Sequence, residues 1–396
     1  MNTELLIEAE EFQANRVVQI SLAHLVHDSY IAFLPAMLPV LIQKFTLTNS
    51  AAGLLTVFMQ FPSFLQPLIG RLGDRVNLRK FVIFTPAITG VVMSLIGIAP
   101  SYAFLAFLMV LAGISSASFH AVGPVLSSSL AGRKLGRGMS FWMVGGELGR
   151  ALGPIITVTA IAYLTVEGLP WLMLAGLLTS IYLSTKLNSL STLPKISGDS
   201  INWLTALRKM RKLMLPMVMV VFFRSMIVAT LTTFLPTYLT TQGSTLWIAG
   251  VSLTILQISA MVGTLFVGSL SDRFGRRRML VISFCVTPVL MYFFVHSEGL
   301  AQIPLLILLG MAAISVVPVL MAIVLENSIE NRSFANGIYM ATSFILTSVA
   351  VFLVGFLSDI FDLRLTFLIS AGVLPLGLPF IMLLPKSKKS QITTSG

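Results

Sequence analysis

The sequence has few charged residues, a single cysteine and no nucleotide-binding loop. Charged residues make up 10% of its 396 residues, hydrophobic residues make up 56%, and the mean hydropathy is +0.92, which excludes an ordinary soluble domain. The lone cysteine, Cys285, excludes an intramolecular disulfide and a cysteine-based metal cluster. Neither a G-x-x-x-x-G-K-[ST] loop nor a G-x-S-x-G elbow occurs. We therefore expect no enzyme and no cofactor, with a proton gradient as the energy source.

Long apolar runs dominate the sequence instead. Runs that cross about 30 Å of hydrocarbon as helices, at about 20 residues each, predict an all-α membrane protein with twelve transmembrane helices. They cover residues 17–42, 51–70, 81–99, 102–130, 139–164, 169–188, 213–241, 246–270, 279–297, 301–325, 334–358 and 365–385. The first residues lack the features of a signal peptide, so we expect the first span to be retained.

Basic residues gather on alternate loops of this predicted topology. One side holds 22 of the 26 Lys and Arg residues, the other holds Lys44 and Arg364, and Arg150 and Arg224 lie inside spans. This imbalance predicts a multi-pass protein of the cytoplasmic (inner) membrane with both termini in the cytoplasm, and it explains the net charge of +11 without nucleic acid. The predicted divisions are a tail at 1–16, a six-helix bundle at 17–188, a linker at 189–212 that ends in an amphipathic surface helix, a second six-helix bundle at 213–385 and a tail at 386–396.

Two short motifs recur about half a chain apart. Gly70-Arg71-Leu72-Gly73-Asp74-Arg75 returns 198 residues later as Gly268-Ser269-Leu270-Ser271-Asp272-Arg273, and Phe33-Leu34-Pro35 returns after 201 residues as Phe234-Leu235-Pro236. A carboxylate at a helix end can pair with arginine and cap a neighbouring helix. We predict conformational locks at Gly70, Asp74, Arg75, Gly268, Asp272, Arg273, Arg276 and Arg277. A plainer interpretation is that both copies are basic loops that only set orientation.

These repeats resemble the loop signature of major facilitator transporters, whose fold is two pseudo-symmetric six-helix bundles with a substrate site between them. The first half is more specific. Its motifs Ser21-Leu22-Ala23-His24-Leu25-Val26-His27-Asp28, Gln66-Pro67-x-x-Gly70, Ser118-Phe119-His120 and Val144-Gly145-Gly146-x-x-Gly149-x-x-x-Gly153-Pro154 resemble the fosmidomycin-resistance branch. That resemblance implies an antiporter for drug resistance: proton-coupled efflux of a small drug-like or metabolite anion by alternating access. The chain departs from the branch at Ala121-Val122 and at Glu147 and Arg150, so the named drug does not carry over.

Ionisable residues inside predicted spans are the candidates for proton coupling, because each costs about 2.5–3.5 kcal/mol at the membrane centre. His24, His27 and Asp28 have the i, i+3, i+4 spacing of one helical face, which suits a proton relay. In the plainer interpretation, His24 lies at the headgroups and only Asp28 is deep. A His-His-Asp metal site is formally possible, but we expect no metal.

Glu147 and Arg150 form a second candidate pair, at i, i+3 of the fifth span. They can neutralise each other, or Glu147 can exchange a proton while Arg150 contacts an anionic substrate. His120, Arg224 and Tyr30 complete the cavity candidates. His120 can equally be a hydrogen-bonded core residue, and Arg224 can extend to the cytoplasmic interface. The small residues Gly145, Gly149, Gly153 and Pro154 predict a packing stripe that ends in a kink.

The expected partners are a small-molecule substrate, protons and the lipid bilayer, for a chain that acts as a monomer. Two alternatives stay open. The same fold can serve a proton-coupled importer or a lipid-handling carrier, and it can also serve a membrane receptor without turnover. Intramembrane charges weigh weakly against the receptor, because a protein without turnover has less need for several of them.

Overall fold

The computed structural model describes residues 12–66, 68–69, 79–187, 203–327 and 332–385, and over these ranges it consists of helices and short connections. The first half of the chain contains α2 (Ala14–Ile31), α3 (Phe33–Phe45), α4 (Asn49–Gln60), η1 (Phe61–Leu65), α6 (Arg79–Ser94), η2 (Ile96–Ile98), α7 (Tyr102–Leu130), η3 (Gly132–Lys134), α8 (Leu135–Leu164), η4 (Leu169–Leu172) and α9 (Met173–Leu187). The first copy of the repeated motif, with Gly70, Asp74 and Arg75, lies outside the described residues.

The second half is also helical. It contains α10 (Trp203–Ala229), η5 (Thr230–Phe234), α11 (Leu235–Thr241), α12 (Leu246–Phe274), α13 (Arg276–Val295), η6 (Gly299–Ala301), α14 (Gln302–Leu309), η7 (Gly310–Ile314), α15 (Val317–Glu326), α16 (Arg332–Phe361), α17 (Leu363–Val373), η9 (Leu374–Gly377) and α18 (Leu378–Leu383). Residues 203–212, where we predicted a separate surface helix, belong to α10, which continues without interruption through Pro216 into the following apolar run. The rest of the predicted linker, 189–202, lies outside the described residues.

Nine helical stretches of the described residues are long and apolar enough to span a membrane. They are Ala14–Phe45, Arg79–Ile98, Tyr102–Leu130, Met210–Thr241, Leu246–Phe274, Arg276–Val295, Gly299–Glu326, Ala335–Phe361 and Leu363–Leu383. All nine correspond to predicted spans, so the chain is a multi-pass, all-helical protein. The count of twelve stays a prediction. Of the remaining three, the fifth coincides with α8, whose hydropathy is lowered by Glu147 and Arg150.

By their internal contacts the residues form two compact units. Unit 1 comprises Met1–Asp199, Ala229–Ile258 and Val351–Arg364, and unit 2 comprises Ser200–Val228, Ser259–Ala350 and Leu365–Gly396. The candidate proton-coupling residues all belong to unit 1. The division of the chain at 189–212 stays a prediction.

Proline sets the break in the first span. Pro35 has no N–H to donate to the carbonyl of Ile31, and α2 ends at that residue, with α3 beginning at Phe33. The repeated Phe234-Leu235-Pro236 has the same effect later in the chain, since Pro236 cannot donate to Thr232, and a π-helical turn, η5, precedes α11 there. Both copies of this motif therefore interrupt a span, the first by a break at Ala32 and the second by a π-helical turn.

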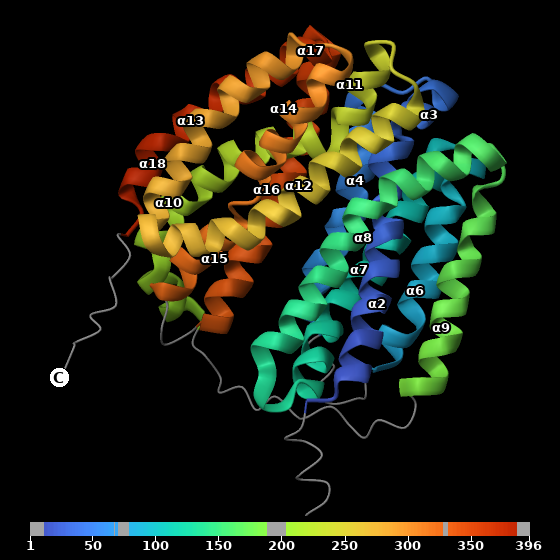
Figure 1. Ribbon diagram of the computed structural model, residues 1–396, viewed down its shortest axis with the longest axis horizontal. Helices are drawn as coiled ribbons and strands as arrows, with labels where there is room; N and C mark the ends of the chain where they lie inside the picture. Colours follow the sequence, from blue (N-terminus) through green and yellow to red (C-terminus); the bar gives the residue numbers. More distant parts are fainter. Residues whose placement is uncertain (1–11, 67, 70–78, 188–202, 328–331, 386–396) are drawn as a thin grey trace, which may run out of the picture. The chain divides into compact units, whose positions relative to one another are not determined.

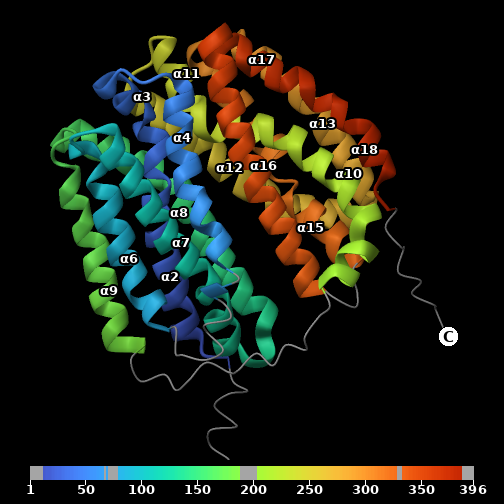
Figure 2. The ribbon, with the colours of Figure 1, turned by 180° about the vertical axis from the view of Figure 1, so that it is seen from behind.

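The first-half helices of unit 1 lie side by side (Figure 1), and α2 packs closely against α8 while α6 contacts α7 and α9. The view from behind shows α4 along α7 (Figure 2). The α2–α8 contact depends on the predicted glycine stripe. A Cβ on Gly145 would lie 2.2 Å from the Ser21 carbonyl oxygen, and one on Gly153 would lie 2.3 Å from that of Ser29. Glycine is therefore required for this close approach.

Candidate functional site

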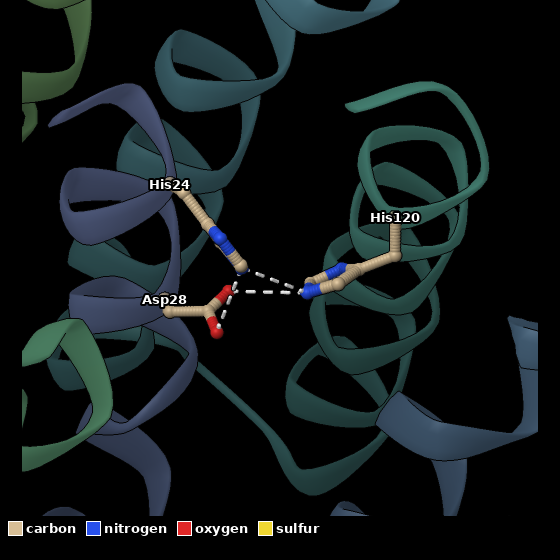
Figure 3. A group of neighbouring side chains, drawn as sticks. All are labelled: His24, Asp28 and His120. Carbon is tan, nitrogen blue, oxygen red and sulfur yellow. Dashed lines mark hydrogen bonds and ion pairs between the residues drawn. The ribbon is translucent and has the colours of Figure 1, made fainter. Parts of the chain in front are cut away.

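A carboxylate and two imidazoles meet between α2 and α7, in the interior of unit 1. Asp28 and His24 project from α2, His120 projects from α7, and the three side chains point toward one another (Figure 3). His24 Nε2 lies 3.2 Å from His120 Nε2 and 3.3 Å from Asp28 Oδ2, while His120 Nε2 lies 3.5 Å from Asp28 Oδ1. The Asp28 side chain is 2% exposed and that of His120 is 28% exposed. The cluster is buried on its α2 side and partly open on its α7 side.

Arg150 of α8 joins this cluster to a second carboxylate. Its Nη1 donates to Asp28 Oδ2 at 3.0 Å, and its Nη2 donates to Glu147 Oε1 at 2.5 Å. The Glu147 side chain is 34% exposed, in contrast to the buried Asp28. One guanidinium thus serves two carboxylates, so the predicted pairing of Glu147 with Arg150 is present but is not exclusive. With neutral imidazoles, Asp28, Glu147 and Arg150 together carry a net charge of −1.

Backbone carbonyls orient both histidines of the cluster. His24 Nδ1 lies 2.8 Å from the Trp142 carbonyl oxygen, and His120 Nδ1 lies 3.0 Å from that of Ser116. Because a carbonyl oxygen only accepts hydrogen bonds, both Nδ1 atoms carry the proton and donate it. The indole of Trp142 also stacks on the His24 ring, with centroids 3.8 Å apart. When the rings are neutral, the Nε2 lone pairs of His24 and His120 are therefore directed at Asp28.

His27 takes a different direction from the one we predicted. Its Nδ1 lies 3.1 Å from Thr89 Oγ1, which in turn lies 2.7 Å from Ser115 Oγ, and its ring stacks on Phe119. Successive residues of a helix are about 100° apart, so the side chains of His27 and Asp28 diverge, although the His27 ring still lies 5.7 Å from the ring of His120. His24 and Asp28 therefore share a face as predicted, and His27 faces α6 and α7. Its Nε2 is buried without a hydrogen-bond partner among the described residues.

The remaining cavity candidates lie away from these contacts. The Tyr30 hydroxyl donates to the Leu172 carbonyl at 2.5 Å and accepts from the Gly176 N–H at 2.9 Å, so this side chain ties α2 to the start of α9. Arg224 belongs to unit 2, where its Nη2 donates to the Ile314 carbonyl at 2.9 Å. That carbonyl ends the π-helical turn η7, and the Arg224 Nε has no hydrogen-bond partner among the described residues.

The second copy of the repeated motif forms a polar junction in unit 2. Arg276 Nη2 lies 2.5 Å from Asp272 Oδ1 and 2.9 Å from Glu326 Oε1, which joins the α12–α13 turn to the end of α15. Gly275, in the turn, has a φ of +96°, a conformation that favours glycine. Arg273 lies over the Phe274 ring, while Gly268 and Arg277 belong to α12 and α13. A carboxylate–arginine pair at this joint agrees with the predicted lock, whose effect on conformation stays a prediction.

Three contributors to the cluster had no signal in the sequence. Trp142 and Ser116 orient the histidines through their backbone carbonyls, which any residue type can supply. Gly146, which we placed within a packing motif, also shapes the site: a Cβ there would lie 2.4 Å from His24 Cε1. A pattern of side chains cannot reveal contacts made by backbone carbonyls, or space left free because glycine has no Cβ.

Comparisons with known proteins point to transport. A family model described as Major Facilitator Superfamily matches residues 20–328 and 249–396. The fosmidomycin resistance protein of Escherichia coli (strain K12) is 23% identical over 375 residues, which cover 92% of this chain and 91% of that protein. The uncharacterized MFS-type transporter YfnC of Bacillus subtilis (strain 168) is 29% identical over 170 residues. That match covers 42% of this chain and spans only 41% of the relative.

Solved structures show the same fold. A bacterial homologue of the human lysosomal transporter Spinster, in an inward-facing and occupied conformation, has a TM-score of 0.79 at 14% identity, and the match covers 94% of this chain and 97% of that one. The nucleoside transporter NupG has a TM-score of 0.74 at 13% identity, with 93% and 98% covered. At these identities the likeness concerns the fold alone.

Proposed function

Because the chain belongs to the Major Facilitator Superfamily, we propose that it couples the movement of a small organic anion to protons by alternating access, in the direction of export. It is a transporter and not an enzyme. The observation that carries the coupling is the sharing of Arg150 by Asp28 and Glu147. Export as the direction is supported by the likeness of nearly the whole chain to a resistance protein.

Arg150 is the proposed contact for the anion. Its guanidinium is the cation of the cluster, and its side chain is 41% exposed, so an anion can reach it without unfolding the bundle. An arriving carboxylate or phosphate would compete with Glu147 for the donors on Nη2. Asp28, buried on the other side, keeps the guanidinium in place.

Glu147 is the proposed entry point for the proton. Its side chain is 34% exposed, whereas that of Asp28 is 2% exposed, so Glu147 is the more accessible carboxylate of this pair. When an anion takes the Arg150 donors, Glu147 loses its partner inside the membrane, where an unpaired charge is costly. Uptake of a proton removes that charge.

This linkage favours a second candidate function, in which anion and proton move together. By reciprocity, protonation of Glu147 releases Arg150 for the anion as much as the anion promotes protonation. Cooperative binding is the requirement for co-transport, and hence for proton-driven import. Export by exchange instead requires that the loaded, deprotonated form and the empty, protonated form be the two that reorient.

Reconstitution in proteoliposomes with a pH-sensitive dye inside tests both directions. Vesicles loaded with a panel of small carboxylates, phosphates and sulfonates are diluted into medium without them. Exchange predicts acidification of the interior as an anion leaves, and co-transport predicts alkalinisation. The proposal fails if no member of the panel moves in response to an imposed pH gradient.

A matched pair of variants assigns the coupling to the site. Glu147→Gln is expected to abolish proton movement while keeping the fold. Glu167→Gln provides the control, because Glu167 is an exposed carboxylate outside the spans whose pKa is lowered by a hydrogen bond from the Thr165 hydroxyl. That carboxylate stays ionised at neutral pH, and its replacement is expected to leave coupling unchanged. Equal losses in both variants would remove Glu147 from the mechanism.

A further inference from the structure

The geometry points to a binding site for a divalent first-row transition-metal ion, such as Zn²⁺ or Co²⁺, at His24, Asp28 and His120. This site was not expected from the sequence, because the third ligand is His120 of α7 and not His27 of α2. The inference does not depend on the proposed coupling at Glu147, which is not one of the three ligands.

The spacing of the three donor groups fits such an ion. Metal–nitrogen bonds of about 2.0–2.1 Å in a tetrahedral site hold neighbouring donor atoms about 3.3 Å apart. Here the two Nε2 atoms are 3.2 Å apart, and each lies 3.3 or 3.5 Å from an oxygen of Asp28. His24 approaches Oδ2 and His120 approaches Oδ1, and one donor atom from each of the three residues lies within 4.8 Å of the other two, so a small closure of the two helices would gather the donors around one ion (Figure 3).

Both imidazoles present the form that binds metal. Each donates Nδ1–H to a backbone carbonyl, His24 to Trp142 and His120 to Ser116, so each neutral ring has its lone pair on Nε2. Metal-bound histidines usually have this outer hydrogen bond, which fixes the ring and its tautomer. Two Nε2 lone pairs 3.2 Å apart beside a carboxylate repel one another unless a proton or a metal ion lies among them.

Within the part of the chain that the structure describes, the cluster has an unpaired carboxylate oxygen and no excess positive charge, both of which favour a bound cation. Asp28 Oδ1 is buried without a hydrogen-bond partner among the described residues, while Oδ2 is held by Arg150. The positive charge of Arg150 is offset by Glu147, so the metal ion would meet the carboxylate of Asp28 and two neutral rings. His120, with its side chain 28% exposed, provides the open side through which an ion can enter and a fourth ligand can bind.

Metal binding to the full-length purified chain tests this site. The protein is prepared with an affinity tag free of histidine, in detergent or lipid nanodiscs, and titrated with Zn²⁺ by calorimetry and with Co²⁺ by visible absorption. We expect one equivalent of each ion and the strong d–d bands of tetrahedral Co²⁺. Absence of saturable Zn²⁺ binding would overturn the inference and would mean that the cluster holds only protons.

Variants distinguish ligation at this cluster from binding elsewhere. His120→Gln is expected to weaken Zn²⁺ binding at least about 100-fold, since the loss of a ligand exceeds the effect of an outer-shell change. His296→Gln removes an exposed histidine at the end of α13 and should leave binding unchanged. Equal binding in His120→Gln and wild type, or equal loss in both variants, would contradict the site.

A substitution that keeps ligation guards against misfolding. His120→Cys retains a donor atom and should add a thiolate-to-Co²⁺ charge-transfer band that wild type lacks. If His120→Cys binds Co²⁺ without that band, residue 120 is not a ligand. Glu147→Gln leaves all three donors in place, so Zn²⁺ should still bind, more weakly because the charge that offsets Arg150 is lost. Failure of the proposed proton coupling and failure of the metal site are therefore separate results.

Discussion

Arg150 is the residue on which the proposed transport depends most directly. Its two terminal nitrogens hold Asp28 and Glu147, and a lysine offers a single ammonium in place of that planar fork. We predict that Arg150→Gln raises the half-saturating concentration of the transported anion at least about tenfold, as expected for the loss of a charge-assisted hydrogen bond. Arg150→Lys should fall between this variant and wild type.

Concentration-dependent flux in proteoliposomes measures this effect. Arg137→Gln is the control, because Arg137 is an exposed arginine near the start of the same helix, stacked over the Phe12 ring. If Arg137→Gln and Arg150→Gln change the flux equally, the anion contact is not at Arg150.

Gly146 makes a second prediction at the residue scale. An added Cβ would lie 2.4 Å from His24 Cε1, so Gly146→Ala must push the imidazole off its stack with Trp142. We expect the free energy of unfolding to fall by about 1–3 kcal/mol, as for overpacking, and Zn²⁺ binding to weaken because His24 moves. Gly136→Ala is the matched control, since a Cβ there meets nothing within 4 Å. Thermal unfolding in detergent and the calorimetric titration measure the two effects, and unchanged values in Gly146→Ala would contradict the close contact.

Among the helices, α4 has a carboxylate at its N-terminus in addition to its N-cap residue, Thr48. Asp359, near the end of α16, accepts hydrogen bonds from the backbone N–H groups of Asn49 at 2.6 Å and Ser50 at 3.0 Å, within unit 1. A carboxylate at this position satisfies two orphan donors and interacts favourably with the helix dipole. We predict that Asp359→Ala lowers the free energy of unfolding by about 0.5–2 kcal/mol, at the lower end because the contact is exposed.

The measurement is thermal unfolding of the purified chain. Glu298→Ala, which removes an exposed carboxylate before η6, should leave the midpoint unchanged. A midpoint that is the same for Asp359→Ala and wild type would show that this cap does not stabilise the fold.

Contacts within one helix can be predicted from the sequence, whereas contacts between helices cannot. Helical spacing alone places His24 beside Asp28, because residues four apart lie on one face. The approach of His120 cannot be read this way, since it lies 96 residues from His24 and depends on how α7 packs against α2. Arg150 likewise pairs locally with Glu147, as its spacing predicts, while its contact with Asp28 arises from the glycine stripe between α8 and α2.

At the scale of the whole molecule, the fold is that of its family and the membrane orientation is still a prediction. The excess of basic residues on one set of loops places η3 in the cytoplasm and the loop before η4 on the opposite side. Lys134 and Glu167 are exposed residues in these two connections, so cysteines there can report the side of the membrane on which each loop lies.

The orientation test is simple because only one native cysteine has to be removed. With Cys285→Ser as the background, Lys134→Cys and Glu167→Cys each provide one thiol for a membrane-impermeant maleimide. We expect Glu167→Cys to react in intact cells and Lys134→Cys to react only in inverted vesicles or after permeabilisation. Reaction of both from the same side would contradict the span count between them, because α8 would not cross the membrane. Reversed labelling would instead place the termini outside, since an even number of predicted spans separates Lys134 from each terminus, and the positive loops would then not set the orientation.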